Sequence, residues 1–412
     1  MVDFHPYQLD NGLKVLLSSN YSSPFAYITV LYHAGSKQEQ PDKTGYAHLF
    51  EHLMFSGTPQ VPDFDQMLQA AGGENNAFTN ADYTHYYDVL PIENIDIGLF
   101  LEADRMEHLL LQQHLFRKEQ KVVVEEFYET CLNMPYGDVW HHLYDLAFQK
   151  HPYRWPTIGK SPEHIEQARL ADVQQFYHDF YRPGNAILSI VAPEPIGQLK
   201  KRVNQYFSDI PSHEVSLPVL PVEAKQHAVR KKEVTASVPH EALYMAFHIP
   251  GRTHQDYRTA DIVTDIFSGG RSSRFYQKLY KDLDVFAQID AYITGSIEPG
   301  LLIIEAKIHE EYNLDHAYQL IRKEIDLLAQ EGVPQNELDK FLEIAHSNML
   351  FSEVQGLNTA MNLAFFQLCG DPDLINSEID AYKNIRPDDV KRFVTDYLSE
   401  NQCSILYVTK TP

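Results

Sequence analysis

Two histidines and a glutamate lie within five residues of one another near the start of the chain, as His48, Glu51 and His52. On an α-helix, residues four positions apart share one face, so the two imidazoles could bind one metal ion together. Glu51 would lie at the edge of that face, where its carboxylate could hold a water molecule and accept a proton from it. The spacing therefore indicates metal-assisted hydrolysis, provided that a third ligand comes from another part of the chain.

A glutamate-rich segment further along the chain could supply that ligand, and it offers four candidates, Glu119, Glu125, Glu126 and Glu129. Residues seven positions apart lie within about 20° of each other around a helix, so Glu119 and Glu126 share a face. Glu125 lies well round from that face, and Glu129 lies one turn past Glu126. A solvated acidic helix is the alternative interpretation. The valines at residues 122–124 favour a partly buried helix instead.

The flanking sequence predicts the elements that position the histidines. Residues 27–34 (YITVLYHA) are typical of a buried strand, which Gly35 ends. Asp42 and Thr44 are candidate N-caps for a helix that carries the histidines. Ser56 and Gly57 (residues 56–57) supply a stop signal. We therefore expect the motif on a short helix that follows a core strand.

These features resemble the M16 metallopeptidases, the family of insulysin, pitrilysin and the mitochondrial processing peptidase, and especially the short bacterial M16B members. The sequence HLFEH at residues 48–52 matches the HxxEH signature of the inverzincins, which is the zinc-protease HExxH motif read backwards. The glutamates Glu119 and Glu126 match the family's second motif in their spacing. The resemblance covers the whole chain.

The resemblance implies a role for each of these residues. It implies one zinc ion held by His48, His52 and Glu126. Glu51 would act as the general base, and Glu119 would support the catalytic site without binding the metal. Two imidazoles and a carboxylate would let zinc polarise the scissile carbonyl and lower the pKa of its water towards ~7.

Two further segments match the family. Residues 72–79 (GGENNAFT) resemble the strand that pairs with the substrate backbone, so Asn76 and Ala77 are expected to bind an extended peptide. His151-Pro152 through Ile158-Gly159 (residues 151–159) resembles a turn of the family. The resemblance implies an α+β chain in the LuxS/MPP-like metallohydrolase fold. Its two homologous α/β-roll halves, each a mixed sheet flanked by helices, would form a clam-shell architecture around peptides or unfolded segments.

An internal repeat in the sequence agrees with two such halves. Residues 171–180 recur as 388–397, displaced by 217, and residues 55–57 (FSG) recur as 267–269, displaced by 212. The early strand and its glycine match residues 243–251, displaced by 216.

We therefore expect an N-terminal zinc-site domain (1–211), a proline-bearing linker (212–232) and a C-terminal domain without metal ligands (233–412).

The repeat also separates function from folding. At a displacement of 212, the counterparts of the three motif residues are Ala260, Val263 and Thr264. The second half is thus expected to build the same helix without them. The motif is therefore more than a requirement of the fold.

One departure from the family bears on partners. Members that supply their own second-half substrate contacts carry an arginine and a tyrosine seven residues apart. Here Tyr280 and Ala287 stand at those places, and a shift by one residue gives only Lys281 and Gln288. We expect this chain to be the zinc subunit of a heterodimer with a metal-free homologous M16 subunit, or otherwise a homodimer. A non-catalytic structural subunit of the same fold is the alternative.

Composition sets further limits. The net charge of −23 speaks against a nucleic-acid partner, whose phosphates would be repelled. No apolar run approaches the ~18 to 20 residues of a membrane span, and the N-terminus does not read as a signal peptide. We expect a soluble chain, cytoplasmic as the sequence stands, or periplasmic if a leader has been removed. The three cysteines are expected to be free buried thiols: Cys131, Cys369 and Cys403.

Overall fold

The computed structural model describes residues 1–411, which form two compact units. Unit 1 comprises Met1–Tyr128, Pro156–Leu220 and Leu350–Ser377, and unit 2 comprises Glu129–Trp155, Pro221–Met349 and Glu378–Pro412. Each unit is therefore assembled from segments of both halves of the sequence. The division of the sequence into continuous parts, 1–211, 212–232 and 233–412, remains a prediction.

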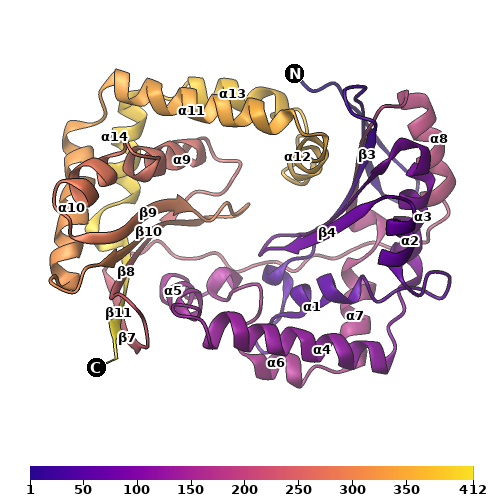
Figure 1. Cartoon of the computed structure of the whole chain (residues 1–412), viewed down its shortest axis with the longest axis horizontal. Coiled ribbons are helices and arrows are strands. Elements are labelled where there is room, and N and C mark those ends of the chain that lie inside the picture. The colour runs from indigo at the N-terminus through magenta and orange to yellow at the C-terminus, as the bar shows by residue number, and fades with distance from the viewer. Residues whose placement is uncertain (412) are drawn as a thin grey trace. The chain divides into compact units, whose positions relative to one another are not determined.

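Unit 1 is built on a six-stranded mixed sheet with the strand order β1-β2-β6-β3-β5-β4. Figure 1 labels two strands of this sheet, β3 and β4. Only the β2–β6 pair is parallel, and every other neighbouring pair is antiparallel. The strands are β1 (His5–Gln8), β2 (Lys14–Ser19), β3 (Phe25–Tyr32), β4 (Glu74–Thr79), β5 (Thr84–Pro91) and β6 (Ala186–Ala192).

Helices cover both faces of this sheet, because its strands alternate apolar residues towards each side. The face that presents Ile28, Val30 and Tyr32 packs against α1, α3 and α8, and the face that presents Leu31 packs against α12. The helices of unit 1 are α1 (Tyr46–Leu53), α2 (Phe64–Ala70), α3 (Ile95–His108), α4 (Gln113–Phe127), α6 (Pro162–Glu166), α7 (Leu170–Phe180), α8 (Ile196–Phe207) and α12 (Gly356–Leu368).

Unit 2 repeats this plan with a five-stranded mixed sheet in the order β7-β11-β8-β10-β9. Helices α9, α10 and α14 pack on one face, and α5 packs against β7, β8 and β11. The strands are β7 (Arg230–Ala236), β8 (Ala242–Ile249), β9 (Phe286–Ile293), β10 (Gly300–Ile308) and β11 (Cys403–Lys410). The helices of unit 2 are α5 (Val139–Ala147), α9 (Gln255–Ser268), α10 (Leu314–Glu331) and α14 (Pro387–Tyr397). Two further helices, α11 (Gln335–Glu353) and α13 (Leu374–Lys383), run from one unit into the other. The two mixed sheets flanked by helices confirm the predicted fold class.

The two halves of the sequence exchange one helix. α5 comes from the first half and belongs to unit 2, whereas α12 comes from the second half and belongs to unit 1. The first residues of the two helices, Val139 and Gly356, are separated by the 217-residue displacement of the repeat. Equivalent helices have therefore changed places, and no pattern in the amino-acid sequence predicts this exchange.

The strand alignment at a displacement of 216 is wrong by one residue. Tyr32 pairs with Ala186 in unit 1, and Phe247 pairs with Cys403 in unit 2. These pairs make Tyr32 equivalent to Phe247, a displacement of 215. A one-residue slip in a strand moves every side chain to the opposite face of the sheet. The displacement of 215 therefore aligns side chains on the same face of the two sheets, and the displacement of 216 does not. The extra residue lies between the strand and Gly251.

The expected linker has little regular structure, but hydrogen bonds to neighbouring segments hold it in place. Residues 211–229 contain no helix or strand, and β7 already begins at Arg230. The Glu223 carboxylate accepts hydrogen bonds from three successive backbone N–H groups, at residues 149–151, over 2.8 to 3.0 Å. Gln226 is buried and donates to the Cys403 carbonyl at 2.8 Å. Among residues 1–411, no helix is long and apolar enough to cross a membrane.

The packing of α12 on β3 predicts opposite effects of two glycine substitutions. A Cβ at Gly356 would overlap the ring of Tyr27, whereas a Cβ at Gly197 in α8 would meet nothing within 4 Å. We expect Gly356→Ala to lower the free energy of unfolding by about 1–3 kcal/mol through overpacking. Gly197→Ala should leave it unchanged or raise it by up to about 1 kcal/mol. Urea denaturation measures both, and equal effects would contradict the packing described for α12.

Candidate metal centre

Helix α1 carries the histidine motif, and a distant glutamate fixes its first turn. The buried Glu39 carboxylate accepts hydrogen bonds from the N–H groups of Gly45 (3.0 Å) and Ala47 (2.8 Å). The N-caps predicted at Asp42 and Thr44 are wrong, because the helix starts after Gly45, whose φ of 89° suits glycine. A carboxylate at this end also complements the helix dipole.

Residues 151–159 form the segment that resembles a turn of the family. Its end, Ile158 and Gly159, packs against the start of α1. A Cβ at Gly45 would lie 2.7 Å from the carbonyl oxygen of Ile158, and Gly159 has a φ of 106°. The Thr44 hydroxyl accepts a hydrogen bond from the N–H of Lys160 at 2.7 Å. These close backbone approaches fix where α1 begins.

Helix α4 is amphipathic, and its buried side fixes the direction of its glutamates. Phe116, Gln120, Val123 and Phe127 are buried. The Gln120 amide donates to the carbonyls at residues 165, 166 and 168 over 2.5 to 3.2 Å. The partly buried helix expected from the three valines is confirmed, with Val123 facing the core and Val122 43% exposed. One valine on the correct face is enough to anchor the helix.

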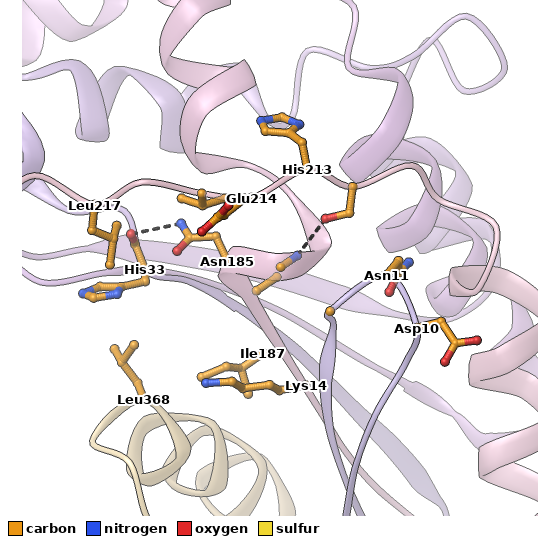
Figure 2. Close-up of a pocket in the computed structure, with 15 residues that line it drawn as sticks. Asp10, Asn11, Lys14, His33, Asn185, Ile187, His213, Glu214, Leu217 and Leu368 are labelled. Atoms are coloured by element: carbon orange, nitrogen blue, oxygen red, sulfur yellow. Dashed lines mark hydrogen bonds between the residues drawn. The ribbon is translucent and has the colours of Figure 1, made fainter.

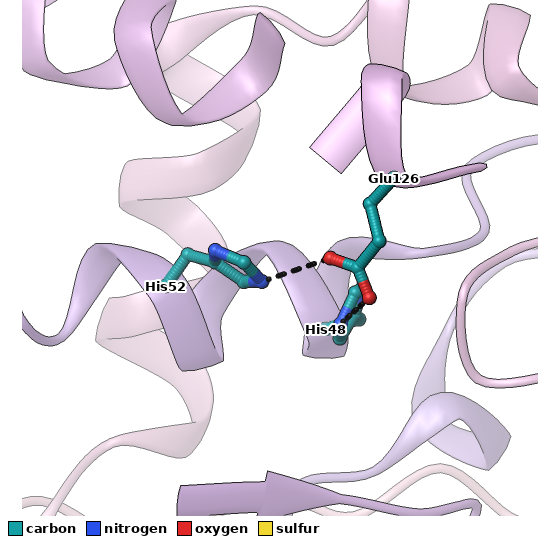
Figure 3. Close-up of side chains that lie close together, drawn as sticks. All are labelled: His48, His52 and Glu126. Atoms are coloured by element: carbon teal, nitrogen blue, oxygen red, sulfur yellow. Dashed lines mark ion pairs between the residues drawn. The ribbon is translucent and has the colours of Figure 1, made fainter. Parts of the chain in front are cut away.

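The three expected ligands converge (Figure 3). One oxygen of Glu126 lies 3.6 Å from Nε2 of His48, and the other lies 3.4 Å from Nε2 of His52. These separations exceed the ~2.7–2.9 Å of a charge-assisted hydrogen bond. Atoms held about 2.0–2.2 Å from one tetrahedral ion are about 3.3–3.6 Å apart, and both nitrogen–oxygen separations fall in this range. One ligand atom from each of the three residues lies within 4.8 Å of the others. Two imidazole nitrogens and a carboxylate oxygen form a donor set that suits zinc.

The other glutamates lie outside this triangle. Glu119 lies 3.8 Å from Nδ1 of His52, the ring nitrogen turned away from Glu126, so it stands where a carboxylate orients a ligand. Glu125 and Glu129 are exposed. Glu51 is half-buried on α1 and makes no hydrogen bond or ion pair with any other described residue.

Burial and neighbouring charges shift the pKa values of the three candidate ligands in different directions. Burial lowers the pKa of His48, which favours the neutral imidazole that binds metals. Glu126 raises the pKa of His52, and His52 in turn lowers the pKa of Glu126. The carboxylate is thus held ionised, and a proton on His52 would compete with a metal ion.

Asn76 and Ala77 lie on β4, the edge strand of the unit 1 sheet, which packs against α1. Asn76 is exposed, and its side-chain oxygen accepts a hydrogen bond from the N–H of Ala77 at 2.8 Å. Ala77 lies directly across from Tyr86 of β5.

The second copy of the motif helix, α9, lacks the polar residues, as predicted. Ala260 and Val263 are completely buried, and Thr264 is 5% exposed. The same helix is therefore built in unit 2 on an apolar face.

Tyr280 and Ala287 lie in unit 2. Tyr280 is exposed on the π-helical segment Phe275–Lys281, and Ala287 is half-buried on β9.

A cavity of about 580 Å³ lies elsewhere in unit 1. It is lined in part by Lys14, His33, His213 and Leu368 (Figure 2). None of the predicted site residues lines it.

Two family models cover most of the chain. The one described as "Insulinase (Peptidase family M16)" matches residues 14–161, and the one described as "Peptidase M16 inactive domain" matches residues 168–344. The chain belongs to the M16 peptidase family. The first model covers the histidine motif, and the second begins at residue 168, within the predicted N-terminal half.

Similar proteins match between 60% and 99% of this chain. It is 25% identical over 408 residues to "Zinc protease PqqE" of Helicobacter pylori, covering 97% of this chain and 91% of that protein. A crystal structure of a protease from Helicobacter pylori matches with a TM-score of 0.95 at 24% identity, covering 99% of this chain and 100% of that one. "Cytochrome b-c1 complex subunit 1, mitochondrial" of Bos taurus is 27% identical over 254 residues, covering 60% of this chain and 52% of that protein.

The donor set predicts the effects of two neighbouring substitutions on metal binding. Glu126→Gln should weaken zinc binding by at least 100-fold, because it removes the ionised ligand. Glu125→Gln, on the exposed side of α4, should leave it unchanged. Chelator competition measures both affinities. In a crystal of the zinc-loaded protein, His48, His52 and Glu126 should each lie about 2.0–2.2 Å from the ion. Zinc bound through Glu125 or Glu129 would contradict the assignment.

Proposed function

We propose that this chain is a zinc-dependent endopeptidase that hydrolyses peptides or unfolded segments at a centre formed by His48, His52 and Glu126. The observation that carries the proposal is the convergence of these ligand atoms from α1 and α4. Helix α1 also carries Glu51, which has no ion-pair partner among the described residues. The relatives named as zinc proteases support it.

The reaction assigns one task to each polar residue of the site. Zinc, when bound, would supply a Lewis acid that activates water and polarises the scissile carbonyl. Glu51 would accept the proton of the attacking water and pass it to the leaving amine. Glu119, beside Nδ1 of His52, would keep that ring in its ligand orientation.

The substrate would bind as an added strand at the edge of β4. The N–H of Ala77 donates to the neighbouring Asn76 side chain, which a peptide carbonyl could replace. The equivalent position in unit 2 is Ala291, because Ala77 pairs with Tyr86 and Ala291 pairs with the equivalent Ile304. There the Ser268 hydroxyl bonds both the N–H (2.8 Å) and the carbonyl (3.1 Å) of Ala291. This contrast between the two edges supports peptide binding at the first one.

A non-catalytic structural subunit is the second candidate. The similarity to a cytochrome b-c1 subunit and the "inactive domain" model of the second half favour it. The retained ligand set and the free carboxylate of Glu51 favour the enzyme.

Replacing Glu51 tests the proposed chemistry. Glu51→Gln should keep zinc, since the residue is not a ligand, and lower the rate of peptide hydrolysis by several orders of magnitude. His52→Ala should lose both zinc and hydrolysis. Metal analysis and cleavage of an unstructured fluorogenic peptide give the two readouts. Equal loss of zinc in both variants, or hydrolysis by Glu51→Gln at the wild-type rate, would contradict the division of roles.

We further propose that the active enzyme is a heterodimer with a metal-free homologous M16 subunit, or otherwise a homodimer. Tyr280 and Ala287 stand where an arginine and a tyrosine would contact the substrate. The missing oxyanion donor can be worth about 2.7–4 kcal/mol.

The isolated, zinc-saturated chain should therefore cleave peptides poorly. Adding a homologue that carries the arginine–tyrosine pair should raise kcat/KM by about 100-fold or more, measured on the same peptide. A homologue in which that pair is replaced serves as the control. Turnover at ordinary protease rates by the chain alone would contradict the divided site.

A further inference from the structure

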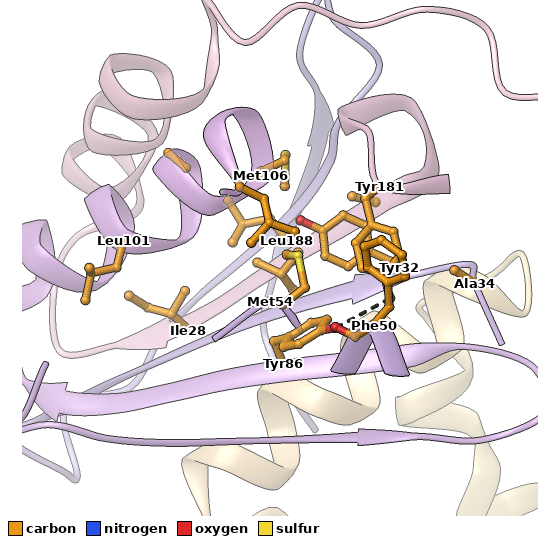
Figure 4. Close-up of a cluster of buried hydrophobic side chains, with 14 of the residues drawn as sticks. Ile28, Tyr32, Ala34, Phe50, Met54, Tyr86, Leu101, Met106, Tyr181 and Leu188 are labelled. Atoms are coloured by element: carbon orange, nitrogen blue, oxygen red, sulfur yellow. Dashed lines mark hydrogen bonds between the residues drawn. The ribbon is translucent and has the colours of Figure 1, made fainter. Parts of the chain in front are cut away.

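Three buried tyrosines lie beneath the motif helix, Tyr32, Tyr86 and Tyr181 (Figure 4). All three are completely buried, and the Tyr32 ring lies 4.6 Å from that of Tyr181 and 5.9 Å from that of Tyr86. Burying a hydroxyl costs free energy unless it is hydrogen-bonded. A packing role alone would be met by apolar side chains.

Unit 2 meets that packing role with apolar side chains at the equivalent positions. The strand pairings make Tyr32 equivalent to Phe247. Val30 pairs with Tyr86 in unit 1, and its equivalent Met245 pairs with Ile304 in unit 2. Tyr86 is therefore equivalent to Ile304. The 217-residue displacement of the preceding helix places Leu398 at the position of Tyr181. Phe247, Ile304 and Leu398 are completely buried. The phenols therefore occur only in the half that carries the motif.

The hydroxyl of Tyr86 reaches the motif helix itself. It donates to the carbonyl of Phe50 at 3.3 Å, and the same carbonyl accepts the N–H of Met54 at 3.0 Å. Phe50 lies between the two histidines of α1. By contrast, the Tyr32 hydroxyl has no hydrogen-bond partner among the described residues.

A buried ion pair holds the Tyr86 ring in place. The Arg105 guanidinium lies 4.6 Å from the ring centroid, and its Nε donates to Glu102 at 2.9 Å. Arg105 is 1% exposed and Glu102 is completely buried. A buried ion pair adds little stability compared with apolar residues of similar size. We therefore assign Arg105 and Glu102 a role in fixing the position of the Tyr86 ring.

Tyr86 also lies at the proposed substrate edge. Its backbone pairs with Ala77 across the β4–β5 ladder, while its side chain points to α1 and contacts the Phe50 carbonyl. One residue thus spans the distance between the edge where a peptide would add and the helix that carries Glu51 and the histidines.

We propose that Tyr86 is a positioning residue that sets the separation between the peptide on β4 and the motif helix, with Arg105 and Glu102 holding its ring. This inference rests on the proposed function. Small displacements of reacting groups cost rate rather than binding, so the effect belongs in kcat.

The test compares Tyr86→Phe with Tyr32→Phe, which removes an equally buried hydroxyl that has no partner. Each variant and the wild type are loaded with zinc for kinetics on an unstructured peptide, with the metal-free homologue added where the wild type needs it. Cobalt(II) replaces zinc in a second set, because its visible absorption reports the coordination geometry. The unfolding temperature is measured throughout.

We expect Tyr86→Phe to lower kcat by about 10- to 100-fold with KM within about twofold, and to alter the cobalt spectrum. Tyr32→Phe should match the wild type in both. Identical behaviour of the two variants, a rise in KM without a fall in kcat, or a Tyr86→Phe protein that fails to fold would overturn the positioning role. A wild type that neither binds metal nor cleaves peptide would instead refute the proposed function.

Discussion

The packing of α1 against α4 is the contact on which the candidate centre depends. Two imidazoles on adjacent turns of one helix and a carboxylate on another can share an ion only if neither helix rotates. Buried polar side chains prevent this rotation at both helices, Glu39 at the start of α1 and Gln120 in the middle of α4. Because an unsatisfied buried polar group is costly, these bonds fix orientation more sharply than apolar packing alone.

The two copies of the repeat show what function adds to a shared fold. Both have a helix against the edge of a mixed sheet. In unit 2 that helix is apolar at the motif positions, and a serine satisfies the sheet edge. In unit 1 the same places hold His48, Glu51 and His52, and the edge N–H of Ala77 donates to its neighbour Asn76. The two units therefore share a helix and a sheet edge but differ in the polar groups placed on them.

The sequence predicted most of the site because its signals are local. A five-residue motif places His48 and His52 on one helical face, and the family spacing selects Glu126 from four glutamates. Glu39 was missed because it lies six residues before the N-cap Gly45, outside any capping pattern. The run of three valines did not reveal which one faces the core. The repeat was found, but its strand register was off by one, since both faces of β3 and β8 are buried and neither alternates with polar residues.

The exchange of α5 and α12 has a consequence for how the protein is made. One face of the unit 1 sheet, including Leu16, Leu31 and Ile187, is covered by a helix that begins at Gly356. During synthesis from the N-terminus, this apolar face stays open until the ribosome has translated most of the chain. Unit 1, which carries the histidines, thus cannot finish folding before α12 has been synthesised, although domains commonly fold in the order of their synthesis. Synthesis of α12, rather than completion of the first half, would mark the point at which His48, His52 and Glu126 become fixed.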